Sequence, residues 1–582
     1  MELSLFTSFL NLFMWDTNSS EDLDSSFDID RALHDNWKKI DSKMKEINEG
    51  KVDKVSGKGL STKDFTTAYE NKLKGIETGA QLNVLEGLTL GGKTLNISGK
   101  KIEIKDTEVT NARESKTKGK TFNDVDARLE EIEDDISNIS KTRGHIYGIR
   151  RKISNNTSSN WERVEDSIGL VANATKNGGE VTNDFDNLSP WKDIVSFNLD
   201  LETGKKKAYF GDADFKFDGS NGDVYTHIPT FWLKIYEEND YMYILIADYE
   251  RSGFIKIKEF DIQRYLTGIG EDGKLHSYSG LAGADFKNIN QYRTLVKNLG
   301  DDYCLMDWRY FAIQCLYLVE YATYNSQSAL GNGMASMRHN NGDVALLAET
   351  NTHRFVVNTG AGNQFIVGQQ VRIGAYDNVS SVIRTITAIN NYEDSNITGK
   401  EIVLDGDPIE NISLTTYIWT CVQNSGGCDS LGMKSGCLVN DGKHNVIYRG
   451  IESIIGNIFS FVDGINIKDC VAYVCYNPKE YVSDKFESPY EKIGYINSKQ
   501  EGYCKALGFD INHPLIQLPT EIGANSTSGT TDYYWCTATG NRVARVGGNS
   551  NNGAGGGLWS WNLSTTSSDS TWSCGARVLK YQ

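Results

Sequence analysis

Residues 542–580 read RVARVGGNSNNGAGGGLWSWNLSTTSSDSTWSCGARVLK, a run of glycines, tryptophans, asparagines and serines. The surrounding stretch, 506–579, contains no lysine, and its charged residues are Asp510, Glu521, Asp532, Arg542, Arg545, Asp569 and Arg577. Aromatic faces cover apolar patches, while short amides and hydroxyls supply directional hydrogen bonds at a small entropy cost. This composition predicts a surface that binds sugar rings or protein loops.

Two tryptophans of this run are two positions apart. In a strand, Trp559 and Trp561 would share one face, with Ser560 and Asn562 on the other. The same pair is also compatible with a place in the core, since the glycines at 555–557 would make room for two large rings. Both interpretations stay open at the level of the sequence.

Upstream of this run, from about residue 145, aromatic residues are dense. Residues 306–321 carry apolar side chains at intervals of three and four, which predicts a core-facing helix. Residues 342–422 read as strand after strand with glycine turns between them, as in NQFIVGQQVRIGAY. We therefore expect a small β domain, 342–422, inserted in a loop of a head that spans 145–582.

Two short heptad seams precede the head. They consist of Leu33, Trp37, Ile40, Met44 and Ile47, and of Val125, Leu129, Ile132, Ile136 and Ile139. Isoleucine at both core positions of a heptad favours three strands, so the pattern predicts a trimeric coiled coil at 119–144 and a short one within 1–48. The alternative is a single amphipathic helix on a globule. Between the seams, apolar residues from Leu88 to Ile104 alternate with polar ones, which predicts a β-rich stalk segment, 49–118.

Composition excludes several classes of partner and cofactor. The formal net charge is -17 and no basic run is longer than Arg150–Lys152, so the chain repels phosphate backbones and we expect no nucleic-acid partner. All 10 cysteines lie between Cys304 and Cys574, without the paired spacing of a zinc site. We expect buried free thiols, no metal and no cofactor; one or two disulfides formed after cell lysis are the alternative.

Residues 1–15 are rich in leucine and phenylalanine. Glu2 and no Lys or Arg precede this apolar core, and no small-residue cleavage site follows it. The run is also too short to span a membrane. We therefore expect no signal peptide and no membrane insertion, and we interpret 1–15 as a docking segment that another protein covers.

Two stretches near the N-terminus resemble phage tail proteins. MWDTNSSEDLDSSFDIDRALHDNWKKID, at 14–41, resembles the segment that fixes tail fibres to the baseplate. VSGKGLSTKDFTTAYENKLKGIETGAQLN, at 55–83, resembles a stalk segment shared by tail fibres of phages that infect Gram-positive bacteria. The resemblance implies that 1–48 attaches the chain to a baseplate or distal tail protein. It also implies a virion component that is made in the host cytoplasm.

A second resemblance covers the head. VIYRGIESIIGNIFSFVDGINI at 446–467, LIQLPTE at 515–521 and the run at 542–580 are together similar to the C-type-lectin-like domain of phage tropism determinants, the variable proteins that diversity-generating retroelements mutate. The expected fold class is therefore α+β and multidomain. It comprises a trimeric coiled-coil and β stalk followed by a C-type-lectin-like head with an inserted small β domain. The expected receptor-binding residues are Tyr533, Trp535, Asn549, Asn551, Asn552, Trp559, Trp561, Asn562 and Trp572.

Together these patterns predict a phage tail fibre that attaches the virion, as a homotrimer, to a glycan or protein receptor on the host surface. The alternatives are a tail-associated glycan depolymerase and the fibre of a phage-tail-like bacteriocin. A depolymerase needs paired carboxylates across a sugar groove, and acidic residues are sparse in the C-terminal region. Formylglycine-generating enzymes share the fold, but their metal-binding cysteine pair is not evident at Cys536 and Cys574. We expect no catalytic residues.

Overall fold

The computed structural model describes residues 144–155, 157–339 and 343–581, together with short stretches between residues 5 and 133. The chain divides into two compact units, Met1–Arg128 and Leu129–Gln582, which are described separately. The described strands of the first unit form short antiparallel pairs: β1 (Leu5–Phe6) with β2 (Phe13–Met14), β3 (Leu88–Leu90) with β4 (Lys93–Leu95), and β5 (Glu114–Ser115) with β6 (Lys120–Thr121).

The described part of the second heptad seam, Val125 to Ile132, is helical, while Ile136 and Ile139 lie outside the described residues. Asp124 Oδ1 accepts a hydrogen bond of 2.7 Å from the backbone N–H of Ala127, which satisfies a free donor at the start of the helix. The seam side chains Val125, Leu129 and Ile132 are exposed in the single chain. The first seam, from Leu33 to Ile47, lies outside the described residues.

The expected α+β class with a trimeric coiled-coil stalk is wrong. In the part of the chain that the structure describes, strands hold 35% of the residues and helices 13%, and no long coiled coil is present. Two or three heptads add few hydrogen-bonded turns to offset a costly helix nucleus, whereas β-branched and aromatic residues between glycine turns favour strands. Heptad spacing over so few turns is therefore weaker evidence for a coiled coil than the surrounding strand patterns are for β structure.

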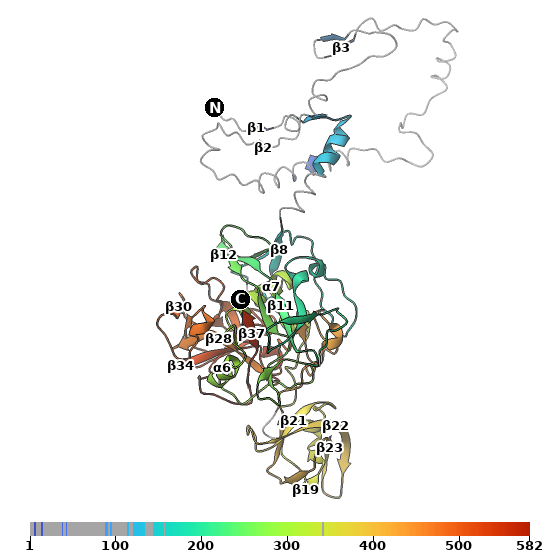
Figure 1. Cartoon of the computed structure of the whole chain (residues 1–582), viewed down its shortest axis with the longest axis vertical. Coiled ribbons are helices and arrows are strands. Elements are labelled where there is room, and N and C mark those ends of the chain that lie inside the picture. Colours follow the sequence, from blue (N-terminus) through green and yellow to red (C-terminus); the bar gives the residue numbers. More distant parts are fainter. Residues whose placement is uncertain are drawn as a thin grey trace, which may run out of the picture. The chain divides into compact units, whose positions relative to one another are not determined.

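Three antiparallel-rich sheets build the main body of the second unit, which is the second unit apart from residues 344–420 (Figure 1). Sheet A has the strand order β14-β12-β13-β7-β8, with β7 (Ile146–Lys152), β8 (Trp161–Glu165), β12 (Phe231–Glu238), β13 (Tyr241–Ala247) and β14 (Ile255–Ile257). Sheet B has the order β10-β9-β11-β15-β37-β18, with β9 (Val195–Leu199), β10 (Lys206–Tyr209), β11 (Asp223–Ile228), β15 (Phe260–Gln263), β18 (Tyr303–Leu305) and β37 (Val578–Tyr581). The last strand of the chain thus lies inside sheet B, between β15 and β18.

Sheet C is the largest and is formed by the C-terminal region. Its order is β30-β29-β28-β34-β35-β33-β31-β32, and β36 pairs with β28. The strands are β28 (Phe459–Lys468), β29 (Val471–Val474), β30 (Glu491–Lys492), β31 (Gly502–Leu507), β32 (Pro519–Ile522), β33 (Tyr533–Cys536), β34 (Asn541–Val546), β35 (Asn562–Leu563) and β36 (Cys574–Gly575). Two small hairpins lie outside the three sheets: β16 (Gly268–Ile269) with β17 (Leu275–His276), and β26 (Ile447–Tyr448) with β27 (Ile451–Glu452).

One long helix fills the core of this unit. α7 (Arg309–Tyr321) is buried along almost its whole length and packs against β7 and β13 of sheet A. It lies within the stretch 306–321 in which the sequence predicts a core-facing helix. The other helices of the main body are α6 (Ile289–Lys297) and the short α8 (Ser326–Leu330). In the described part of the chain, no helix combines the length and the apolar run that a bilayer crossing needs.

Residues 344–420 form two further sheets with their own core cluster, which includes Phe355, Ile402 and Ile418. One sheet has the order β20-β23-β22-β21-β25, and β19 pairs with β24. The elements are β19 (Glu349–Thr352), β20 (Arg354–Val357), α9 (Thr359–Gly362), β21 (Gln370–Gly374), β22 (Val382–Glu393), β23 (Thr398–Leu404), β24 (Ile409–Ile412) and β25 (Tyr417–Thr420). A largely buried ion pair between Arg372 and Asp285, at 2.9 Å, joins this β unit to the main body.

Candidate functional site

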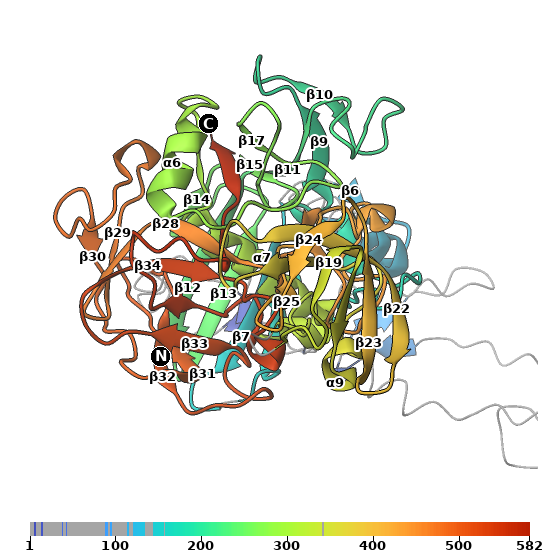
Figure 2. The same ribbon diagram turned by 90° about the horizontal axis from the view of Figure 1, so that it is seen from below.

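The strand β33 carries two aromatic rings on one face and buries its other face. Tyr533 and Trp535 are half-buried, whereas Tyr534 and Cys536 are buried, which is the alternation expected of a strand with one covered face. β31 lies next to β33, and Tyr503 stands opposite Tyr533 in the register. Figure 2 shows β31, β32 and β33 gathered at one end of sheet C. We call Tyr503, Tyr533 and Trp535 the aromatic row.

The rings of the aromatic row contact one another in sequence. The Tyr503 and Tyr533 centroids are 5.4 Å apart in an edge-to-face arrangement, and those of Tyr533 and Trp535 are 4.7 Å apart. Trp535 then meets the buried ring of Phe459 edge-on, at 5.5 Å. Such contacts fix the rings without covering them, since all three residues of the row keep part of their surface in solvent. The row is therefore a pre-ordered aromatic platform.

The charged residues of the C-terminal segment are mostly directed away from the surface. Asp510, Asp532, Arg545 and Arg577 are buried. Burial raises the pKa of Asp532 well above its usual range, and burial lowers the pKa of Arg577 to about 10. These four groups therefore add little charge to the surface beside Tyr533 and Trp535, whereas Glu501 and Lys505, on either side of Tyr503, are exposed.

A glycine-rich loop, 547–557, lies against the row. A Cβ atom at Gly555 would come within 2.9 Å of the Tyr533 Cβ, so only glycine permits this approach. The loop is held in place by Gln327, whose side-chain amide donates to the carbonyls of Gly553 and Gly556 at 2.8 and 2.6 Å. The closeness of loop and ring makes a continuous surface of the two.

The asparagines of this loop divide into two roles. The Asn552 side chain accepts a hydrogen bond of 2.7 Å from the Asn549 backbone N–H, and the Asn549 side chain accepts one of 3.0 Å from Asn551 N–H. Asn549 and Asn552 thus hold the loop conformation. Asn551 is exposed, and its side chain makes no hydrogen bond to any residue that the structure describes. Its amide is free to meet a ligand.

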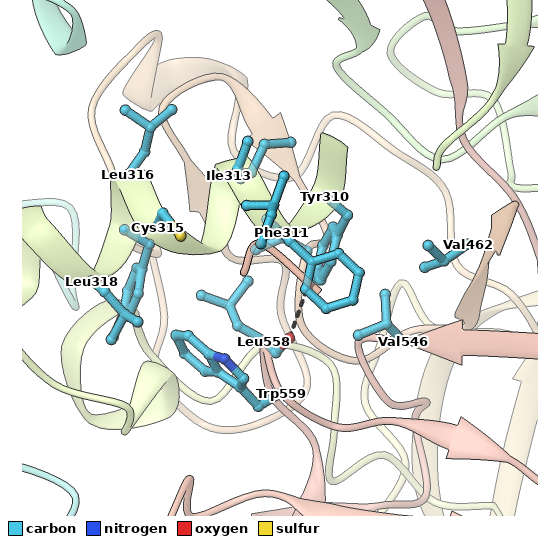
Figure 3. Close-up of a cluster of buried hydrophobic side chains, with 14 of the residues drawn as sticks. Tyr310, Phe311, Ile313, Cys315, Leu316, Leu318, Val462, Val546, Leu558 and Trp559 are labelled. Carbon is cyan, nitrogen blue, oxygen red and sulfur yellow. Dashed lines mark hydrogen bonds between the residues drawn. The ribbon is translucent and has the colours of Figure 1, made fainter. Parts of the chain in front are cut away.

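Trp559 and Trp561 belong to the core. Trp561 is fully buried and stacks on Phe311 of α7 at 5.0 Å, while Trp559 packs edge-on against Tyr324 at 4.9 Å. Figure 3 shows Leu558 and Trp559 facing the side chains of α7, with the Tyr310 hydroxyl donating to the Leu558 carbonyl at 2.9 Å. Neither tryptophan presents a face to a receptor, so the core interpretation of this pair is the correct one and both leave the candidate site.

Asn562 and Trp572 are also engaged within the fold. The Asn562 side chain is buried and accepts hydrogen bonds from Ser564 N–H and Oγ at 3.1 and 2.9 Å. Trp572 stacks on His339 with centroids 3.8 Å apart, close to the β unit 344–420. Burial of His339 lowers its pKa to about 4, so the ring opposite Trp572 is neutral at physiological pH. Trp572 acts as a packing contact at this junction.

Of the predicted residues, the structure places Tyr533 and Trp535 side by side and adds Tyr503 to them, and it leaves Asn551 exposed in the loop that meets Tyr533 at Gly555. Tyr503 lies 30 positions before Tyr533, and the sequence carries no local signal that the two strands pair. Only the register between β31 and β33 brings the two rings together. No periodicity within either strand could have shown it.

All ten cysteines are buried free thiols, and within the described residues no cluster of three or more His, Cys, Asp or Glu side chains is arranged to hold a metal ion. No protein-family model matches the chain, and no curated protein matches its sequence.

Proposed function

We propose that this chain is the receptor-binding fibre of a phage tail, and that it attaches the virion to the host surface through the aromatic row. The observation that carries the proposal is the row itself, with three part-exposed rings in mutual contact next to a glycine loop. Aromatic faces pack against the apolar faces of sugar rings or against protein loops, and neighbouring amides such as that of Asn551 bind hydroxyls.

The N-terminal resemblance supports the same function. Segments similar to baseplate-attachment and stalk sequences precede the head, which is the order that a tail fibre requires. In this proposal the N-terminal segment binds a baseplate or distal tail protein, and the protein resides in the virion. We expect a chain without residues 1–45 to bind cells and to be missing from assembled tails.

Self-association is part of the proposal. A single shallow aromatic platform binds weakly, and several copies on one particle raise the effective affinity by orders of magnitude. We propose a homotrimer, the state that light scattering of the purified chain would show at micromolar concentration. A stable monomer under those conditions would rule it out.

The proposal is tested by cell binding. Fluorescently labelled full-length chain is incubated with a panel of Gram-positive bacteria, and the bound fraction is compared with that of a Tyr533→Ala, Trp535→Ala double variant. A Tyr209→Ala variant serves as control, because Tyr209 is an exposed tyrosine on sheet B. We expect the double variant to lose binding and the control to keep it. Binding that survives the double substitution, or absent binding to every strain, would contradict the proposal.

A further inference from the structure

A cavity of about 380 Å³ lies on the main body and shares no lining residue with the aromatic row. Its walls come from α6, β18, β28 and the end of β37, together with the short turn Pro478–Glu480. Figures 1 and 2 both show α6 close to the C-terminal end of the chain. In sheet C, β34 and β35 separate β28 from β33 of the row. The cavity is thus a second, independent feature.

Three tyrosine side chains form much of the cavity wall. Tyr303, Tyr481 and Tyr581 line it. Two of their hydroxyls are engaged, since Tyr481 donates to Asp307 and Tyr581 to the Asp301 carbonyl, both at 2.8 Å. These tyrosines therefore contribute mainly ring surface. A volume of this size lies within the range of small-molecule sites, at the lower end of roughly 300–1,000 Å³.

A buried ion pair forms part of the lining. Arg293 binds Asp463 through two parallel hydrogen bonds, from Nε at 2.8 Å and from Nη2 at 2.6 Å. Its Nη1 group donates to Asn290 and Ser483. Because Asp463 is almost fully buried and already paired, it adds no net negative charge to the cavity.

The exposed part of the lining is cationic. Lys297, in the last turn of α6, and Lys479, in the turn 478–480, are both exposed and both line the cavity. Neither lysine side chain has an ion pair or hydrogen bond with any residue that the structure describes. By contrast, Lys580 nearby is paired with Asp302, and Lys505 with Glu521. Asp301 is the exposed carboxylate among the lining residues and offsets one of the two lysines, so the exposed lining keeps a net positive charge.

We propose that this cavity binds an anionic saccharide unit, a sugar ring that carries a carboxylate or a phosphate. The ring packs on Tyr303, Tyr481 and Tyr581, and the anion lies between the ammonium groups of Lys297 and Lys479. The chain as a whole has a net charge of -17 and repels anions. The two unpaired lysines beside the aromatic cavity attract an anion locally. The assignment of the sugar as part of the host receptor rests on the proposed function.

Calorimetric titration of the full-length chain tests the proposal, with glucuronic acid, glucose 6-phosphate and glucose as probes. We expect at least one of the two anionic sugars to bind at least tenfold more tightly than glucose, and this binding to weaken as salt is added. Preference for glucuronic acid identifies a carboxylate ligand, and preference for glucose 6-phosphate a phosphate ligand. Equal binding of all three sugars, or no binding of either anionic sugar, would overturn the proposal.

A Lys297→Gln, Lys479→Gln double variant should reduce the affinity for the anionic sugar at least tenfold with an unchanged melting temperature. The control is Lys274→Gln with Lys499→Gln, two exposed lysines outside the cavity lining, which should change nothing. An unchanged affinity in the first double variant would also refute the proposal. Cell binding through the aromatic row is measured separately, so failure at the cavity and failure of the proposed function give different results.

Discussion

Two aromatic pairs in the C-terminal segment have the same spacing and opposite environments. Tyr533 and Trp535 lie at a surface, while Trp559 and Trp561 are core residues. β33 and β35 are neighbours, and Trp535 stands opposite Asn562 in the register, so Trp561 falls on the other face of the sheet. That other face is covered by α7, which precedes it by more than two hundred residues. Spacing therefore tells which residues share a face, and a distant element decides which face is buried.

The largest effect is expected at the buried pair. Replacing Trp559 or Trp561 by Ala leaves a large cavity against α7 and should cost about 3–5 kcal/mol of the free energy of unfolding. Thermal melting of each variant measures the loss. If either variant kept the wild-type melting temperature, that tryptophan would not be a core residue and the contrast between the two pairs would fail.

The second effect concerns the carboxyl group that supports the buried pair. Asp532 accepts the backbone N–H of Trp559 at 2.8 Å, and burial raises its pKa well above its ordinary value of 3.8. The folded state thus holds the proton more tightly than the unfolded chain. The stability that this carboxyl group contributes is fully present at a pH below its ordinary pKa. It is lost as the pH rises through the raised pKa of the folded state.

An Asp532→Asn variant cannot ionise and should therefore gain stability relative to the wild type as the pH rises. The difference between the two unfolding free energies should change by about 1.4 kcal/mol for each pH unit within that window. Denaturant unfolding at pH 5, 6 and 7 gives the difference directly. If the unfolding free energies of the two proteins changed in parallel with pH, Asp532 would be ionised in the folded state.

A third experiment compares adjacent residues on opposite faces of β33. Tyr533→Ala removes a ring of the aromatic row and should reduce binding to host cells by about 2 kcal/mol per site, roughly thirtyfold, with little change in melting. Tyr534→Ala removes a fully buried ring whose hydroxyl donates to the Ser498 carbonyl at 3.0 Å, and should lower the melting temperature. If Tyr533→Ala lowered the melting temperature and Tyr534→Ala reduced cell binding instead, the aromatic row would lie on the buried face of β33. Tyr503→Ala should behave as Tyr533→Ala does.

Much of the head follows from local patterns, and the rest depends on long-range pairing. The apolar spacing at 306–321 predicts a core-facing helix where α7 lies. The coiled-coil prediction from the heptads at 125–139 is wrong, because heptad spacing does not show whether there are enough helical turns to form a stable coiled coil. The sequence does not predict Tyr503 as a site residue, and it does not decide whether Trp559 is buried, for the same reason. The pairing of β31 with β33 and the cover from α7 both join segments far apart in the chain.

The smallest effect separates two asparagines of the glycine loop that are adjacent in sequence. Asn551 is exposed with a free amide, whereas Asn552 accepts the Asn549 backbone N–H. Asn551→Ala should weaken cell binding by about 1 kcal/mol, the net value of a typical hydrogen bond, and leave melting unchanged. Asn552→Ala should instead lower stability by about 1 kcal/mol, since it leaves a donor in the loop without its partner. Calorimetric melting and cell binding of both variants distinguish the two roles. An effect of Asn551→Ala on melting would mean that its side chain supports the loop and is no longer free to bind a receptor.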